Sequence, residues 1–143
     1  MLKGIPRIIS PELMKVLLEM GHGDEIVLAD GNFPAASHTN NVVRCDGHHI
    51  PELLEAILLF FPLDTFVEKP VTVMKPVGNA SNTPAIWEEY KECIKKYDLF
   101  ADSFEMVERY EFYEQAKKAY AIIATSESAL YVNIILKKGV IQE

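Results

Sequence analysis

Apolar residues at helical spacing mark the first secondary-structure element of the chain. Four of them form one buried stripe: Leu13, Val16, Leu17 and Met20. Ser10 can accept hydrogen bonds from the free amides at the start of this helix, and Pro11 suits its first turn. Gly21 can adopt the left-handed conformation that ends a helix. We therefore expect a helix between Ser10 and Gly21.

A short run of apolar residues follows that helix. Residues 25–30 read Glu-Ile-Val-Leu-Ala-Asp, which predicts a strand covered on both faces. Asp30 stands at the carboxyl end of this strand, where ligands tend to bind in layered α/β proteins. Taken alone, such an aspartate is more often a turn former than a catalytic acid, so both roles stay open.

Helices and strands alternate through the rest of the chain. Apolar patterns predict further strands over residues 41–45, 65–74, 105–108, 120–125 and 131–136, and further helices over 51–61, 83–97 and 110–119. The helix that begins near Pro51 is apolar almost all round, so we expect it to be buried inside the domain or against another subunit. The last two strands are close enough in sequence to pair antiparallel. The expected fold is α/β: a layered α/β/α single domain over residues 1–143 with a mixed β-sheet.

Charge and composition argue against several classes of partner. The 143 residues include 14 Lys and Arg against 21 Asp and Glu, a net charge of -7. Because no basic patch offsets this charge, we expect no nucleic acid and no membrane as partner. The longest apolar run, residues 56–63, is interrupted by Pro62 and is too short to span a bilayer. Two cysteines far apart in sequence, Cys45 and Cys93, indicate free thiols in a cytoplasmic protein.

His22 is the first candidate for acid–base chemistry. It stands between Gly21 and Gly23, where the bare backbone lets a ligand approach closely. An imidazole can give or take a proton near neutral pH, and a nearby carboxylate such as Asp30 would orient the ring and favour its charged form. The spacing fits equally well a histidine that caps the last carbonyls of the preceding helix.

A second group of side chains has the composition of a metal site. Imidazoles and a carboxylate, His38, His48, His49 and Asp46, are ligands that suit zinc or iron. Their spacing is weak evidence, because adjacent histidines in a strand point to opposite faces and the chain has no His-x-x-x-His pair on a helix. Histidines exposed on loops explain the same pattern.

Polar and aromatic side chains near the end of the chain could bind a polyhydroxylated ligand. Arg109 precedes Phe112 and Tyr113, and a guanidinium can hydrogen-bond vicinal hydroxyls while rings lie against the apolar face of a sugar. Alternatively, the rings belong to the core and Arg109 pairs with a neighbouring glutamate. Tyr131 and Asn133 alternate at the start of the last predicted strand, so their phenol and amide would share one face.

Once these segments are taken together, the chain resembles the L-fucose mutarotase and D-ribose pyranase family over nearly its full length. The resemblance is carried by Ile-Ser-Pro-Glu-Leu at 9–13, Met-Gly-His-Gly-Asp at 20–24, Asp-Gly-Asn-Phe-Pro at 30–34, Arg-Cys-Asp-Gly at 44–47, Arg-Tyr-Glu-Phe-Tyr-Glu at 109–114, Tyr-Val-Asn at 131–133 and Leu-Lys-Lys-Gly at 136–139. Arginine at 109 followed by Phe-Tyr is similar to the fucose branch, since ribose pyranases carry a histidine and a less aromatic stretch there.

The resemblance implies a ribose-pyranase-like fold and an isomerase without a metal or other cofactor. The family's proton donor matches His22, and Asp30 lies with it at the centre of the reaction. The positions that match sugar-binding or pocket-lining residues of the family are Asp30, Asp64, Met74, Arg109, Tyr113, Tyr131, Val132 and Asn133. The implied partner is a free monosaccharide, L-fucose before D-ribose or galactose. The implied assembly is a homodecamer of stacked rings with sites at subunit boundaries.

Four functions are therefore compared below. The first is an L-fucose mutarotase that interconverts anomers by ring opening and reclosure, with His22 as general acid and base. A D-ribose pyranase is an alternative from the same resemblance. A sugar-binding module without turnover is another, indicated by the aromatic and amide side chains that could bind a sugar. A metal-dependent hydrolase that uses the histidine group and Asp46 is the fourth.

Overall fold

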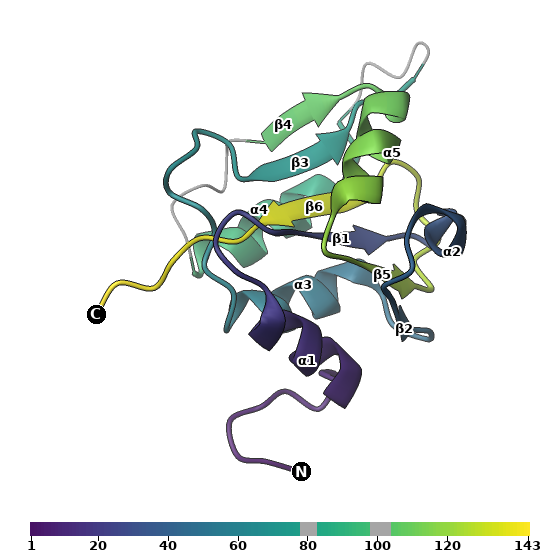
Figure 1. The fold of residues 1–143 in the computed structure, drawn as a ribbon. Helices are drawn as coiled ribbons and strands as arrows, with labels where there is room; N and C mark the ends of the chain where they lie inside the picture. Colours follow the sequence, from purple (N-terminus) through teal and green to yellow (C-terminus); the bar gives the residue numbers. More distant parts are fainter. Residues whose placement is uncertain (78–82, 98–103) are drawn as a thin grey trace.

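The computed structural model describes residues 1–77, 83–97 and 104–143, and these form one six-stranded mixed sheet between layers of helices. The strands are β1 Glu25–Ala29, β2 Val42–Cys45, β3 Val71–Met74, β4 Phe104–Val107, β5 Ala121–Thr125 and β6 Ile134–Lys137. The helices are α1 Pro11–Glu19, α2 Ala35–His38, α3 Ile50–Leu58, α4 Ile86–Lys95 and α5 Arg109–Lys118. Figure 1 shows the strands side by side with α5 in front of them.

The sheet order is β2-β5-β1-β6-β3-β4. β5 pairs parallel with β1 and β2, and β3 pairs parallel with β4. β6 runs antiparallel to both of its neighbours, β1 and β3. The sheet is therefore mixed, as expected, but the predicted pairing of the last two strands is wrong, because the apolar strand β1 lies between them.

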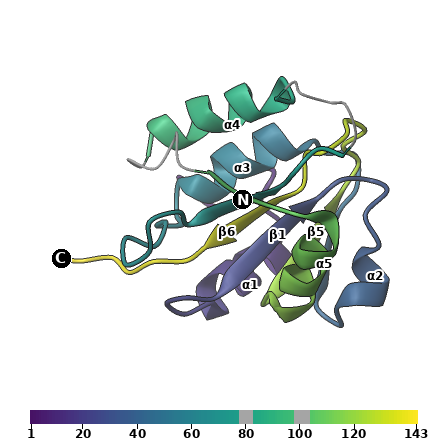
Figure 2. The same ribbon diagram turned by 90° about the horizontal axis from the view of Figure 1, so that it is seen from above.

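Helices cover both faces of the sheet, which confirms the expected α/β/α layering. The buried residues of α1, α3 and α4 pack on one face with Ile26, Leu28 and Ile134, and those of α5 pack on the other with Val27 and Ile122. Figure 2 shows α3 and α4 on one side of the strands, with α2 and α5 on the other. β1 buries residues on both faces, which explains its continuous apolar run.

Helix α3 lies between the sheet and α4 (Figure 2). It is therefore covered on both sides, which accounts for its apolar residues nearly all round. Leu53, Leu54 and Ile57 are all fully buried within the chain. This helix was expected to be buried inside the domain or against another subunit, and the structure shows burial inside the domain. Apolar exposure is confined to the residues just after it, where Leu59 is 47% exposed.

Several local predictions hold and others need correction. Ser10 accepts a hydrogen bond from the Leu13 N–H at 3.1 Å, as a helix cap should. Helix α1 ends at Glu19 with Met20 in extended conformation, so the left-handed residue is Gly23 (φ +86°) rather than Gly21. The short helix α2 was not predicted. Among the described residues, no helix has the length and apolar character needed to cross a membrane.

Candidate active site

The strand order brings several predicted site residues to one edge of the sheet. β1 and β3 run in the same direction and end there, and β6, which runs the other way, begins there between them. Asp30 follows β1, Met74 ends β3, and Asn133 precedes β6. Residues far apart in the chain therefore become neighbours because their strands are adjacent.

Asp30 and Asn133 are joined by a pair of hydrogen bonds. The Asp30 N–H donates to the Asn133 Oδ1 atom at 2.7 Å, and the Asn133 Nδ2 atom donates to the Asp30 carboxylate at 3.0 Å. A third bond, from the Asn32 N–H at 2.8 Å, occupies the other carboxylate oxygen. Asn133 is 4% exposed, whereas Asp30 is half-buried. The three hydrogen bonds therefore hold a partly exposed carboxylate rigidly at the end of β1.

The remaining predicted residues of this edge come from α5 and from the segment before β6. Arg109 is exposed at the first turn of α5 and donates to the Tyr110 hydroxyl at 3.4 Å. This hydrogen bond raises the pKa of Arg109, and the guanidinium lies over the Tyr110 ring, 5.2 Å from its centroid. Val132, which follows Tyr131, is fully buried and offers the site only its backbone.

Tyr131 differs from its prediction. It lies before β6 rather than in it and has a φ of 58°, the left-handed conformation that bulky residues rarely adopt. Strand alternation therefore does not place Tyr131 and Asn133 on a common face. The position of Asn133 against Asp30 depends on the shape of the loop before β6.

The opposite edge of the sheet holds His22 and Asp64. The His22 Nε2 atom lies 3.0 Å from the Asp64 carboxylate, and the imidazole is 44% exposed while the carboxylate is 4% exposed. Asp64 is positioned by its N–H bond to the Lys137 carbonyl and by the bridge between Leu63 and Lys138, next to the end of β6. The Phe66 ring packs against His22 with a centroid distance of 5.1 Å.

The charge on Asp64 determines which nitrogen of His22 carries the proton. Burial acts to raise the pKa of Asp64, but the Phe66 N–H and the His22 ring together outweigh it and leave the pKa below its ordinary value. An ionised carboxylate only accepts hydrogen bonds, so the Nε2 atom must donate. In the neutral ring the Nδ1 atom is then the free base, as a proton-transfer catalyst requires.

The structure does not bring His22 and Asp30 together within one chain. β1 separates them, and five residues at about 3.3 Å each extend roughly 16 Å. The His22 imidazole with its buried carboxylate therefore forms one polar group, and Asp30 with Asn133 forms a second at the opposite edge.

The side chains proposed for a metal site have other partners. Asp46 forms an ion pair with Arg44 at 2.8 Å, His48 lies 3.4 Å from Glu52, and His49 lies 3.3 Å from Glu127. No group of three or more His, Cys, Asp or Glu residues in the described ranges could hold a metal ion. Cys45 and Cys93, the chain's two cysteines, are both buried and free. His48 and His49 lie in the loop before α3, as the alternative interpretation expects, whereas His38 ends helix α2 and its Nδ1 atom lies 2.9 Å from the Pro34 carbonyl.

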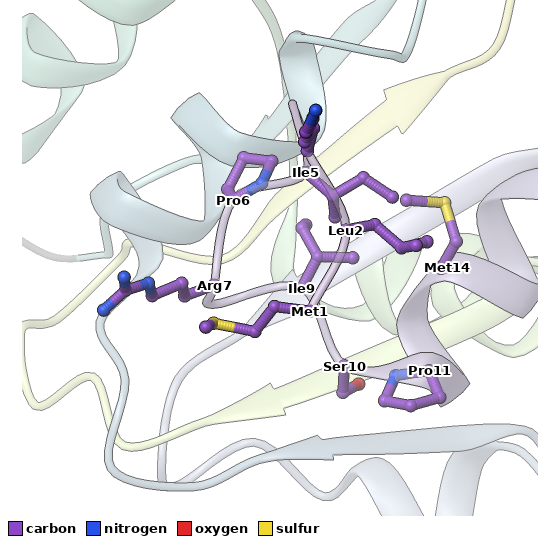
Figure 3. A pocket seen from close by; sticks show the side chains of 10 residues that line it. Met1, Leu2, Ile5, Pro6, Arg7, Ile9, Ser10, Pro11 and Met14 are labelled. Carbon is purple, nitrogen blue, oxygen red and sulfur yellow. The ribbon is translucent and has the colours of Figure 1, made fainter.

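A hollow of about 700 Å³ lies away from both edges, between the N-terminal segment and α1. Figure 3 shows its lining, with the side chains of Leu2, Ile5 and Met14 gathered together and the Arg7 guanidinium pointing away from them. None of the predicted site residues lines it. Its mostly apolar lining offers no acid–base pair for opening a sugar ring.

Sequence patterns missed two residues that shape the site. Phe66 is 68% exposed and lies against His22, but a single aromatic residue in an extended stretch carries no signal of that contact. Glu127 is a buried acidic residue that follows β5. Its backbone carbonyl accepts a hydrogen bond from the Gly31 N–H at 2.8 Å, next to Asp30. It fell within a segment interpreted only as a polar turn.

Comparison with known proteins gives consistent matches. A model of the RbsD / FucU transport protein family matches residues 3–141. The human protein named fucose mutarotase is 50% identical over 147 residues, covering 98% of this chain and 94% of its own. The crystal structure of a fucose mutarotase in complex with L-fucose from Streptococcus pneumoniae is 51% identical, with a TM-score of 0.94 over 99% of this chain and 100% of its own. FucU from Bifidobacterium longum is 55% identical, with a TM-score of 0.93 over 98% of this chain and 100% of its own.

Proposed function

Because the chain belongs to the RbsD / FucU family, we propose that it is an L-fucose mutarotase, an isomerase that interconverts the α and β anomers of the free sugar. The structural observation that carries the proposal is the His22–Asp64 pair. It is an oriented, half-exposed imidazole on an ionised carboxylate. The opposite edge supplies a rigid carboxylate–amide pair, Asp30 and Asn133, suited to sugar hydroxyls.

The reaction needs only proton transfers. A base takes the proton of the anomeric hydroxyl, an acid protonates the ring oxygen, and the bond between the anomeric carbon and the ring oxygen breaks to leave the open-chain aldehyde. Rotation of the aldehyde followed by reclosure on its other face gives the second anomer. We assign proton transfer to His22 through its Nδ1 atom, with Asp64 holding the ring. We assign sugar binding to the edge that carries Asp30.

To the sugar-binding group we assign Asp30, Met74, Arg109, Tyr113, Tyr131, Val132 and Asn133, which belong to helix α5 or lie at the ends of β1, β3 and β6 that share this edge. Asp30 is central to the reaction because its carboxylate is already oriented by Asn133 and Asn32. Arg109 and the phenols around it supply hydrogen bonds and a ring surface for the sugar. Met74 contributes an apolar wall at the end of β3.

The separation of the two polar groups supports sites built at subunit boundaries. If the edge with His22 in one copy faces the edge with Asp30 in the next, the contact is head-to-tail, and such contacts form a ring where the rotation between copies closes. Exposed apolar residues stand at both edges, Leu18 and Ile141 on the first and Tyr110 and Leu130 on the second. Exposed apolar surface of this kind is typical of interfaces. We infer a homodecamer of two stacked rings, in the cytoplasm, where buried free thiols are stable.

Exchange NMR between the anomeric protons tests the function directly. The purified protein should accelerate anomer exchange of L-fucose more than that of galactose, and His22→Ala should reduce the rate by about a hundredfold or more, as expected for loss of a general acid–base group. His48→Ala, which changes another half-exposed histidine, is the matched control and should retain full activity.

Other outcomes of the same experiment identify the alternatives. Acceleration confined to pyranose–furanose exchange of D-ribose would make the protein a D-ribose pyranase. Saturable sugar binding without faster exchange would make it a sugar-binding module and would end the proposal that it is an enzyme.

A further inference from the structure

The loop between β5 and β6 holds a strained residue at the proposed sugar site. Tyr131 has a φ of 58° and is the one non-glycine residue with positive φ in the described ranges. The left-handed conformation is unfavourable for a residue with a bulky side chain, and it persists only where surrounding contacts enforce it. Two residues of another element, α4, contact this loop.

Two buried side chains of α4 bind consecutive carbonyls of this loop. The Trp87 Nε1 atom donates to the Tyr131 carbonyl at 2.9 Å, and the Tyr90 hydroxyl donates to the Val132 carbonyl at 2.6 Å. Trp87 is 4% exposed and Tyr90 is fully buried. The two residues are three positions apart on one face of α4, so a single rigid helix presents both donors.

Fixing two successive carbonyls fixes the peptide planes on either side of Val132. The first plane sets the direction of Tyr131, and the second leads directly into Asn133, whose Oδ1 atom accepts the Asp30 N–H. The Tyr90 hydroxyl remains a neutral donor, since burial raises its pKa far above the physiological range. Neither Trp87 nor Tyr90 reaches the sugar edge except through this loop.

We propose that Trp87 and Tyr90 are positioning residues that hold the Tyr131–Asn133 loop in its sugar-binding conformation. The expected change in KM rests on the proposed function. The inference that α4 holds the loop does not depend on it. Periodicity assigns both residues to the apolar stripe of a helix, and they do pack there. Their donor groups perform a separate task that helical spacing does not reveal.

The variant Tyr90→Phe tests the proposal because it removes one hydroxyl and keeps the ring. Loss of one buried hydrogen bond should raise the KM for L-fucose anomer exchange by about fivefold, while kcat falls by less than about twofold. The kcat is retained because His22 and Asp64 lie at the other edge of the sheet. Trp87→Phe should act in the same direction through the Tyr131 carbonyl.

Ile94→Val is the matched control, since Ile94 is a fully buried residue of α4 that contributes only packing. This variant should lose stability with no change in KM. Amide hydrogen exchange at Val132 and Asn133 provides a readout that needs no activity, and it should accelerate in Tyr90→Phe but not in Ile94→Val.

An unchanged KM and unchanged amide exchange in Tyr90→Phe would overturn the proposal, leaving Tyr90 as a packing residue. If the wild-type protein accelerates exchange of no aldose, the proposed function fails, and amide exchange alone then decides whether α4 holds the loop.

Discussion

At the scale of single residues, the His22–Asp64 contact explains how an exposed imidazole can have a defined tautomer. Exposed histidines usually rotate and exchange protons with water. Here the Asp64 side chain is only 4% exposed, and it is itself fixed by the Phe66 N–H at 3.0 Å. The ring is therefore oriented by its Nε2 atom, while the imidazole as a whole stays 44% exposed.

The lowered pKa of Asp64 predicts a specific loss of stability in acid. A carboxyl group whose pKa is depressed on folding stabilises the protein fully above its unfolded pKa, about 3.9, and this stabilisation is lost as the pH falls through the folded value. Wild type should exceed Asp64→Asn in free energy of unfolding at pH 6, and the difference should shrink steadily below pH 4. Urea denaturation at a series of pH values measures this.

Asp46→Asn is the control for that series. Asp46 also has a lowered pKa, caused first by its hydrogen bond from Arg44, but both partners are exposed and solvent screens the pair. Its effect should be smaller than that of Asp64→Asn. A difference between wild type and Asp64→Asn that stays constant from pH 6 to pH 3 would contradict the role assigned to the buried carboxylate.

Single residues also show what local sequence can predict about the site. Asp30 follows an apolar strand and Ser10 precedes an amphipathic helix, so their places were predictable from neighbours in the chain. The conformation of Tyr131 was not, because its cause lies in Trp87 and Tyr90, more than 40 residues away. The flanking glycines made His22 a candidate for acid–base chemistry, and its place after a strand made Asp30 a candidate for ligand binding, but the catalytic roles came from the family resemblance.

At the scale of elements, the positions of helices and strands follow from periodicity, whereas strand order does not. Periodicity predicted β1 and β5 within a residue or two. It paired β5 with β6 because the two are consecutive, yet β1 lies between them and pairs with both. Strand order is decided by which apolar faces α1, α3, α4 and α5 can cover, information that is spread over the whole chain.

Gly139 packs closely against the segment that carries Leu63 and Asp64, beside His22. A Cβ atom on Gly139 would lie 2.6 Å from the Leu63 carbonyl and 2.9 Å from the Asp64 Cα atom. Both are backbone atoms that cannot rotate away, so Gly139→Ala must push the segment that carries Asp64. We expect a loss of about 1–3 kcal/mol in the free energy of unfolding, the range for overpacking a tight contact.

The nearby Gly21→Ala is the comparison, since its Cβ atom would meet only an Asp24 carboxylate oxygen at 3.7 Å. Urea denaturation should find this variant within about 0.5 kcal/mol of wild type, as for most surface changes. The amide resonance of Phe66, whose N–H donates to Asp64, should move in Gly139→Ala and stay in place in Gly21→Ala. Equal stability of the two variants would show that the contact relaxes easily.

At the scale of the whole molecule, the sheet itself divides the chemistry. The group assigned to proton transfer, His22 with Asp64, lies at one edge, and the group assigned to sugar binding, Asp30 with Asn133, lies at the other, with the length of β1, roughly 16 Å, between them. A sugar ring cannot span that distance. We therefore propose that a complete site combines the His22 edge of one copy with the Asp30 edge of another, so that activity depends on the assembly.

Mixing two inactive variants tests this directly. His22→Ala lacks the proton-transfer half and Asp30→Ala lacks the sugar-binding half, so each homo-oligomer should be inactive. In randomly mixed rings, half of the boundaries receive an intact His22 edge, and half of those face an intact Asp30 edge. Refolding an equimolar mixture should therefore restore about one quarter of wild-type anomer exchange, as expected for a head-to-tail interface.

A mixture of His22→Ala with Asp64→Ala separates this explanation from simple stabilisation by co-refolding. Both changes lie in the same half-site, so no copy in any mixed ring contributes an intact pair. This mixture should stay inactive although its rings form equally well, as native mass spectrometry can verify. If mixed rings of His22→Ala and Asp30→Ala form and remain inactive, the two edges do not meet, and the sugar site must be sought within a single copy.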